Sequence, residues 1–478
     1  MKSLARALPG LPLLACLAGC LAVGPDYEPP TLTTPAAGFH HAAELANSDA
    51  EPPERWWEGL HDPTLDRLIR QAERDNFDLK IATANLLAVR ASRDAAVGQL
   101  FPTLDATATY MRYRESAATQ LDNPAIAAPD VNLTEVAAGL SWQLDLVGRV
   151  RRTIEATEAD SAQSAALRKQ VQILMIAEVA GTYIDLRGAQ LRLAVANHNA
   201  QNQQKTYQLT LTLSDAGRGT DLDVARARAQ LESTLATIPP LQAQLTADKH
   251  QMAVLVGLPP DALDDLLDTE APLPSIPDFL PVGNPTTMLR RRPDVTAAER
   301  ALAAATARIG VATADLYPTL SFSVTPSLQA LQPADLGKKG AFGYGIGPSL
   351  SMPVFDLGVY ARLRGANANQ QAALASFQKT VLTALAETET ALDAYRQERA
   401  RRQSLTVASE ASARAADLAS TRYRFGAENF LAVLDAEAKQ LAAEDQQAQS
   451  EIAVAQDLVT IYRALGGGWS LAAAAEAD

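Results

Sequence analysis

Proline is distributed so unevenly along this chain of 478 residues that two stretches are left free to form very long helices. No proline occurs from Asp130 to Ile238, and none follows Pro353. Proline breaks helix interiors, so these two stretches permit uninterrupted rods. Apolar residues at three- and four-residue steps predict long helices over about 148–214 and 365–424. About 60 residues at 1.5 Å each give roughly 90 Å, a length that no compact globule needs.

Shorter helices are predicted on either side of the two rods. They are expected at about 63–99, 220–257, 293–316 and 429–466. Asp62 is a plausible N-cap of the first of them, with Pro63 at its first helical position. Aromatic residues make up only 5% of the chain, which suits long helices better than a compact mixed core. Residues 258–284 are rich in proline and aspartate and are predicted to be a surface linker.

A nearly identical phrase occurs twice, as QLFPTLDATAT from residue 99 and as DLYPTLSFSVT from residue 315. After each phrase the apolar period changes from 3.6 to 2, which predicts strands. The four strands are expected at about 103–113, 134–147, 318–328 and 342–355. Each run has one face of apolar residues and one face of small or polar residues.

Two environments produce such strands. A soluble sandwich buries the greasy face, whereas a membrane barrel turns it toward lipid over segments of about ten residues. The length of the runs favours the barrel. Four strands cannot close a barrel alone, and open edges are not tolerated in lipid. Several chains must therefore contribute strands to one sheet.

The first residues, MKSLARALPGLPLLACLAGC, have the pattern of a secretory signal peptide, expected over 1–19. Leu17-Ala18-Gly19-Cys20 resembles the bacterial lipoprotein cleavage box. Cys20 is therefore expected to be acylated and to begin a lipid-anchored segment, residues 20–60. Leu21, by resemblance to other lipoproteins, favours the outer membrane. The alternative is ordinary secretion with an incidental cysteine. Because Cys16 is removed with the signal, no disulfide is expected within the mature chain.

The order helix, PTL turn, two strands, long helix and final helix occurs twice. Matching landmarks lie at nearly constant offsets: 216 for Pro102 and Pro318, and 211 for Asp145 and Asp356. This spacing predicts an internal duplication, with repeat 1 at 61–257 and repeat 2 at 285–478.

Several classes of function are disfavoured by composition. The formal net charge is −13 and the basic residues are scattered, so a nucleic-acid partner is not expected. The short run Arg290-Arg291-Arg292 is interpreted as a solvated or capping cluster. The five histidines are dispersed, and no metal spacing, nucleophile elbow or phosphate loop stands out. We expect no enzyme activity, no metal site and no cofactor besides the covalent lipid on Cys20.

Long blocks of the sequence resemble the TolC-type outer-membrane factors, in the lipoprotein branch called NodT-type. These blocks are VGPDYEPP, WWEGLHDPTLDRLI, LRRRPDVTAAERALAAATARIGVATADLYPTLS and RYRFGAENFLAVLDAEAKQL. The resemblance implies an α+β fold of mainly long α-helices that assembles as a homotrimer. Its twelve-stranded barrel would cross the outer membrane of a Gram-negative bacterium, and its helical tunnel would cross the periplasm. The family provides the passive exit duct of tripartite efflux pumps, joined to a periplasmic adaptor and an inner-membrane transporter.

The resemblance also assigns roles to the two helix-to-helix turns, at 215–221 and 424–429. In the family, turns of this kind lie at the periplasmic tip and meet the adaptor. That docking role is carried over to Gly219, Thr220 and Gly426. Glycine suits such reversals because it tolerates positive φ. The alternative is that these glycines are only helix caps.

The resemblance further implies a gate, where polar contacts hold the inner helices shut. Its residues here are Arg422, Tyr423, Arg424 and Asp435. In a trimer, three copies of Asp435 would ring the axis, and neighbouring carboxylates repel unless cations compensate. Arg226 is the approximate counterpart of Asp435 in the first repeat, which suggests a charge link between the halves. The alternative is that these are solvated surface charges.

Two other functions remain open from the sequence. One keeps the fold but exports proteins, as the duct of a type I secretion system. The other is a lipid-anchored periplasmic coiled-coil scaffold without a pore, which leaves the four alternating strands unexplained. Ion conductance separates a scaffold from a channel.

Overall fold

The computed structural model describes residues 22–31, 38–41, 51–114, 116, 130–277 and 279–469. The predicted signal peptide and Cys20 lie outside these residues. The described chain is mostly helical with a single four-stranded sheet, so the α+β class is confirmed. It divides into two compact units, which are taken in turn. Unit 1 comprises 1–30, 86–164 and 298–377, and unit 2 comprises 31–85, 165–297 and 378–478.

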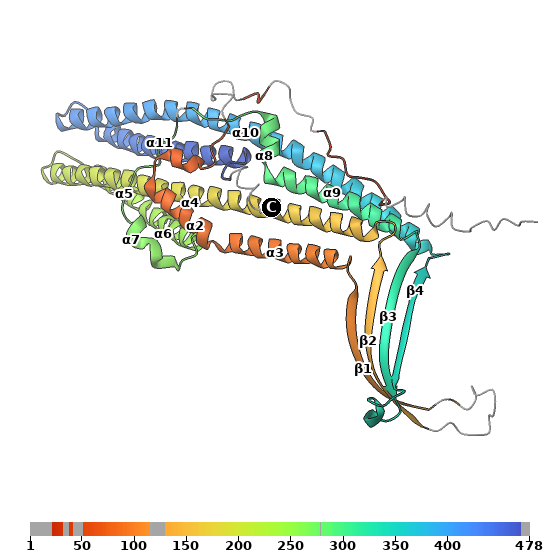
Figure 1. Ribbon diagram of the computed structural model, residues 1–478. Coiled ribbons are helices and arrows are strands. Elements are labelled where there is room, and N and C mark those ends of the chain that lie inside the picture. The colour runs from red at the N-terminus through yellow and green to blue at the C-terminus, as the bar shows by residue number, and fades with distance from the viewer. Residues whose placement is uncertain are drawn as a thin grey trace, which may run out of the picture. The chain divides into compact units, whose positions relative to one another are not determined.

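The sheet belongs to unit 1 and is antiparallel in the order β1-β2-β3-β4 (Figure 1). Its strands are β1 Thr103–Tyr113, β2 Val131–Leu144, β3 Thr319–Ala330 and β4 Phe342–Ser351. Strands that are far apart in sequence, β2 and β3, are therefore neighbours in the middle of the sheet.

The register brings the apolar side chains of all four strands onto one face. Leu104 pairs with Leu140, Leu140 with Val324, and Val324 with Ile346. The adjacent row crosses the sheet on the opposite face. It consists of Thr103, Ser141, Ser323 and Gly347. A shift of one residue in any strand would mix the two faces, because successive side chains point to opposite sides.

The apolar face is open. Leu104 is 73% exposed, and on β4 Tyr344 is 73% and Leu350 67% exposed. Within the described residues, β1 pairs only with β2 and β4 only with β3, so both outer edges keep unpaired backbone groups. An exposed apolar face with two open edges is a surface that needs a partner.

The strands end earlier than the alternation predicts, because an aspartate follows each second strand. Asp145 accepts hydrogen bonds from the backbone N–H groups of Val150 and Arg151 (3.0 and 3.1 Å), and Asp356 accepts one from Gly358 (2.7 Å). These carboxylates start the long helices α4, Arg149–Asp215, and α10, Leu357–Arg424. The expected strand ends at 147 and 355 and the expected helix start at 365 are therefore wrong. The two rods contain 67 and 68 residues.

An N-terminal segment is held in unit 1 by a buried arginine of α4. Arg152 donates to the carbonyls of Val23 (3.1 Å) and Gly24 (3.3 Å) and binds the carboxylate of Asp26 at 2.7 Å. Gly24 lies directly on α9, Pro293–Ala314: a Cβ at Gly24 would come within 2.4 Å of the Cα of Gly310. Glycine at position 24 therefore allows the two backbones to touch. Glycine at position 310 instead leaves room for the Arg152 side chain, which a Cβ there would meet at 2.8 Å.

In unit 2 two helices that the sequence predicts as continuous are broken. The first is divided at Asn76 into α2, Pro63–Asp75, and α3, Phe77–Gly98, because the buried Asn76 amide binds the carbonyl of Leu255 (2.9 Å). The predicted cap is correct: Asp62 accepts from the N–H groups of Thr64 and Leu65.

The second break lies just before two prolines. Helices α5, Asp221–Leu235, and α6, Ile238–Leu255, are separate because Pro239 and Pro240 lack the N–H groups that would continue the helix. The predicted linker at 258–284 also contains two short helices, η4 Pro260–Leu263 and α7 Asp264–Leu267. Leu263 and Leu267 are buried, so this segment contributes to the core.

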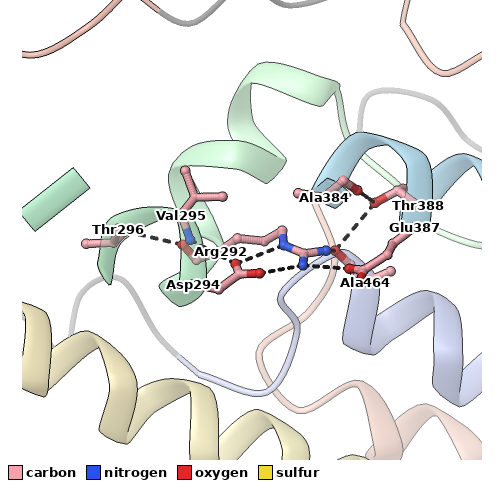
Figure 2. Close-up of polar contacts among 8 residues, drawn as sticks. All are labelled: Arg292, Asp294, Val295, Thr296, Ala384, Glu387, Thr388 and Ala464. Carbon is pink, nitrogen blue, oxygen red and sulfur yellow. Dashed lines mark hydrogen bonds and ion pairs between the residues drawn. The ribbon is translucent and has the colours of Figure 1, made fainter. Parts of the chain in front are cut away.

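Of the two interpretations of the arginine run, a solvated or a capping cluster, the structure supports capping for Arg292, which binds a carbonyl at a helix end. The run lies at the end of α8, Pro285–Arg291, and Arg291 and Arg292 are buried, whereas Arg290 is exposed. Arg291 donates to the carbonyl of Pro52 at 2.6 Å. Figure 2 shows Arg292 at the centre of a polar node that ties three helices together.

Arg292 binds partners at the start of α9 and on α10 and α11, the two helices that form the second helical hairpin. It forms two hydrogen bonds with Asp294 at 3.0 and 2.6 Å and one with Glu387 of α10 at 2.8 Å. It also donates to the carbonyl of Ala464 at 2.9 Å, at the end of α11, Phe430–Ala464. This cation therefore satisfies a helix C-terminus as well as two carboxylates.

The long helices reverse direction through matching turns. After α4, the N–H groups of Gly217 and Arg218 bind the carbonyls of Ser214 and Leu213, both at 2.8 Å. After α10, those of Gly426 and Ala427 bind the carbonyls of Tyr423 and Arg422, both at 2.9 Å. This is the Schellman pattern, and φ is 74° at Gly217 and 73° at Gly426. The positive φ predicted for Gly219 belongs instead to Gly217.

The Arg292 node yields a test of stability. We expect Arg292→Met to lower the free energy of unfolding by about 2–3 kcal/mol, because Asp294 and a helix-end carbonyl lose a buried charged donor. Arg290→Met, at the exposed neighbour, should change it by less than about 0.5 kcal/mol. Urea unfolding of the detergent-solubilised protein measures both. Equal effects would contradict the role of Arg292.

The turn after α10 yields a second test. No atom lies within 4 Å of a Cβ built at Gly426, so the cost of a side chain there is only conformational. Gly426→Ala should destabilise the protein by about 1–2 kcal/mol, and Gly426→Asn by clearly less, because asparagine tolerates the left-handed region. Urea unfolding compares the two. If alanine is tolerated as well as asparagine, positive φ is not required at this position.

Candidate functional site

The residues expected to dock an adaptor lie at the helix reversals of unit 2. Thr220 is the N-cap of α5, and its side chain accepts from the N–H of Asp223 at 3.2 Å. Gly219 lies close to the end of α4, since a Cβ there would be 3.1 Å from the Ser214 nitrogen. Asn429 caps α11 in the same way, through the N–H of Ala432 at 2.9 Å. The tips are therefore rigidly capped turns.

Large apolar side chains are exposed beside these caps. Phe425 is 84% exposed, and Leu222 and Leu431 are more than half exposed. Exposed apolar groups of this size next to rigid turns are suited to contact another protein.

Of the residues expected at the gate, Tyr423 packs against a buried apolar cluster. Its ring lies 5.3 Å from the ring of Phe430 and packs against a buried cluster shared by α5 and α11. The cluster consists of Ala227, Phe430, Val433 and Leu434. Burial, and to a lesser degree the charge of Asp223, raises the pKa of Tyr423. The tyrosine therefore stays neutral and joins the second hairpin to α5.

Two of the charged residues expected at the gate make exposed or partly exposed contacts within the described chain. Arg422 lies 3.5 Å from the carboxylate of Glu428, and Asp435 binds Lys439 one turn further along α11 at 2.7 Å. Exposed pairs of this kind contribute little to stability. The suggested link between Arg226 and Asp435 is not found among the described residues of the single chain, and it stays a prediction for the assembly. Asp435, 60% exposed, already has a partner on its own helix.

The fourth gate residue, Arg424, lines a cavity that sequence reasoning missed. This tip cavity has a volume of about 470 Å³ and lies among α4, α10 and α11. Gln203 of α4 and Glu437 of α11 are buried in its wall, and the hydroxyl of the half-buried Thr206 of α4 donates to Glu437 Oε1 at 2.6 Å. The four expected gate residues are thus distributed over separate contacts and do not form one cluster in the chain.

Glu437 had a signal in the sequence. Phe430, Val433, Leu434 and Glu437 follow the 3-, 4- and 7-residue spacing of one helix face. A carboxylate on such an apolar stripe is expected to be buried, and Glu437 is only 8% exposed. Burial raises the pKa of Glu437, and the hydrogen bond from Thr206 opposes this rise.

Two absences are recorded for the part of the chain that the structure describes. It has no group of three or more histidine, cysteine, aspartate or glutamate side chains positioned to hold a metal ion. In the same residues, no helix combines the length and the apolar character that crossing a bilayer requires.

Comparison with known proteins places the chain in a family. The sequence profile of the outer membrane efflux protein family matches residues 68–258 and 284–467. The chain is 30% identical to Nodulation protein T of Rhizobium leguminosarum bv. viciae, over 98% of this chain and 95% of that protein. It is 31% identical to the pyoverdine export outer membrane protein OpmQ of Pseudomonas putida, over 98% of each chain.

A solved structure agrees in both fold and sequence. The outer-membrane channel OprN superposes with a TM-score of 0.86 at 42% identity, over 94% of this chain and 99% of that chain. The match spans both units and both helix reversals. The chain therefore belongs to the outer membrane efflux protein family, and it is an outer-membrane component of a bacterial efflux system.

Proposed function

We propose that three copies of this chain form a closed channel through which an efflux pump passes small molecules from the periplasm to the exterior. The observation that carries the proposal is the register of the sheet. Its apolar face is continuous over four strands, and its edges at β1 and β4 are open. Three sheets joined edge to edge make a barrel of twelve strands, with lipid outside and the serine, threonine and glycine face toward water.

The proposed duplication is supported by the helix caps. The four residues that make the Schellman bonds after α4 correspond to those after α10 at a single offset of 209. The ends of α6 and α11 keep the same offset, with φ of 73° at Gly257 and 71° at Gly466. If each chain contains two similar repeats, a trimer contains six similar helical hairpins, which would form a ring with nearly sixfold symmetry. Such a ring is suited to a tunnel wall.

The proposed partners follow from the tips. A periplasmic adaptor would contact the capped turns at Gly219, Thr220 and Gly426 and the exposed apolar groups beside them, and would link the duct to an inner-membrane transporter. In the closed state, Asp435 from three chains would approach the axis, with Arg422 and Arg424 as compensating cations. Relatives of the chain are named for export of pyoverdine and for efflux of toluene and antibiotics, which supports small-molecule cargo over protein export.

Conductance tests the channel and its gate together. Purified protein in planar lipid bilayers should form trimers that dissociate on heating and should show a small resting conductance. Asp435→Ala should raise that conductance several-fold, because the cations that surround the carboxylate lose their partner. Glu410→Ala, an exposed glutamate of α10, is the control and should leave it unchanged.

The outcomes separate the two parts of the proposal. A monomeric protein without conductance would overturn the channel. A conducting trimer whose resting state is indifferent to Asp435→Ala would keep the channel and remove Asp435 from the gate.

The lipid anchor has its own test. Cys20→Ser should abolish incorporation of labelled palmitate, because only a thiol forms the thioether that holds the diacylglycerol. Trimers should still form, since the barrel itself is expected to anchor the protein. Palmitate labelling of membranes measures the first effect, and labelling of the serine variant would disprove acylation at Cys20.

A further inference from the structure

Two buried polar side chains in the tip cavity lack the hydrogen-bond partners that buried polar groups normally have. Gln203 is 3% exposed, and neither its amide oxygen nor its amide nitrogen has a hydrogen bond within the described residues. Glu437 is 8% exposed, and its Oε2 likewise has no partner there. Burying unsatisfied polar groups costs about 1–3 kcal/mol each, so a tightly packed helix interface would not retain them without a use.

These groups lie where the second hairpin meets α4. Glu437 follows Asp435 by two residues on α11, and its Oε1 accepts a hydrogen bond from Thr206 of α4 at 2.6 Å. A second bond joins the same two helices further along, from Asn199 of α4 to Glu444 of α11 at 2.6 Å. Gln203 precedes Thr206 by one turn on the same face of α4. Any movement of the α11 tip away from α4 must therefore break the bond between Thr206 and Glu437.

The charges around the cavity do not neutralise Glu437. On α4 the nearest lining charge is Lys205, and on α10 the lining charges are Asp417 and Arg424, all exposed at the mouth. The residues of α5 that are buried, Ala227, Leu231 and Thr234, are uncharged. Among the residues that the structure describes, an ionised Glu437 thus has one hydrogen bond, from Thr206, and no ion pair, and burial of such a group is costly.

We infer that Glu437 is a proton-controlled latch on the gate. When neutral, its carboxyl group stays in the closed interface, bonded to Thr206 and able to donate its proton to a neighbouring acceptor such as the Gln203 amide oxygen. When ionised, it draws water into the tip cavity and loosens α11 from α4. This inference rests on the proposed gate and adds to it a residue that acts on helix packing away from the Asp435 ring.

The direction of the pH effect follows from the closed state. Burial raises the pKa of Glu437 in the closed interface relative to a water-exposed state. Glu437 therefore binds its proton more tightly in the closed state than in the open state. Because of this difference, protonation at low pH shifts the equilibrium toward the closed state. Each pKa unit of difference between the states changes the equilibrium of one latch up to about tenfold. Channels should therefore close on acidification and open more readily as the pH rises through that raised pKa.

Single-channel recording of the purified trimer between about pH 4 and pH 8 tests the latch. The wild type should lose open probability several-fold toward acid pH. Glu437→Gln, which keeps the shape and the bond from Thr206, should remain as closed as the acidified wild type and lose most of the pH dependence. Glu410→Gln on α10 should retain the wild-type profile. Thr206→Val should move the midpoint to higher pH, because the bond that favours the ionised form is gone.

The outcomes distinguish this inference from the gate on which it rests. If Glu437→Gln keeps the wild-type pH profile, or if Thr206→Val does not shift the midpoint, the latch is wrong. Asp435→Ala should raise the basal conductance and retain the pH dependence. A flat profile in Glu437→Gln with no effect of Asp435→Ala would support the latch and overturn the Asp435 gate. Trimer content and helicity, measured for each variant, exclude a loss of fold as the cause.

Discussion

The backbone of a sheet in contact with lipid must find all its hydrogen bonds inside protein, and one chain of this channel cannot satisfy that demand. Both outer strands, β1 and β4, end in unpaired edges, and the apolar row that contains Leu104 and Ile346 faces outward. Water would solvate the edges but not the apolar face, and lipid would cover the face but not the edges. Only closure with further strands resolves both, so the proposed barrel would make assembly a condition of its stability.

Charge is used differently at the two ends of the long helices. At the sheet, Asp145 and Asp356 bind the first N–H groups of α4 and α10 and thereby set where extended chain becomes helix. At the helix reversals, Arg422 and Asp435, two of the residues expected at the gate, make weak pairs within the chain. A carboxylate that caps a helix stays bound to the N–H groups of that helix. Asp435 binds Lys439 in an exposed pair, which is weak enough to be exchanged for other partners in the proposed trimer.

The sequence predicted the elements whose causes are local. Alternation placed the four strands, the absence of proline placed the two rods, and Asp62 was identified as a cap from its neighbours alone. Some predictions failed where a distant residue decides the structure, whereas the missed break before Pro239 and Pro240 has a local cause. The break at Asn76 depends on the carbonyl of Leu255, which lies 179 residues away in sequence. Arg292 is buried because Ala464 and Glu387 converge on it, and a run of three arginines carries no sign of that.

By itself, then, the sequence determined the periods of the helices and strands, the two-part order of the chain and the family. These depend on short-range sterics and on the spacing of apolar side chains, which neighbours in the chain are enough to specify. Only the tertiary structure decided that four separate strands share one apolar face. It also placed Glu437 with Gln203 and Thr206 around one cavity lined by α4, α10 and α11. These depend on register and on contacts between segments some 200 residues apart, because burial and desolvation are properties of the packed chain.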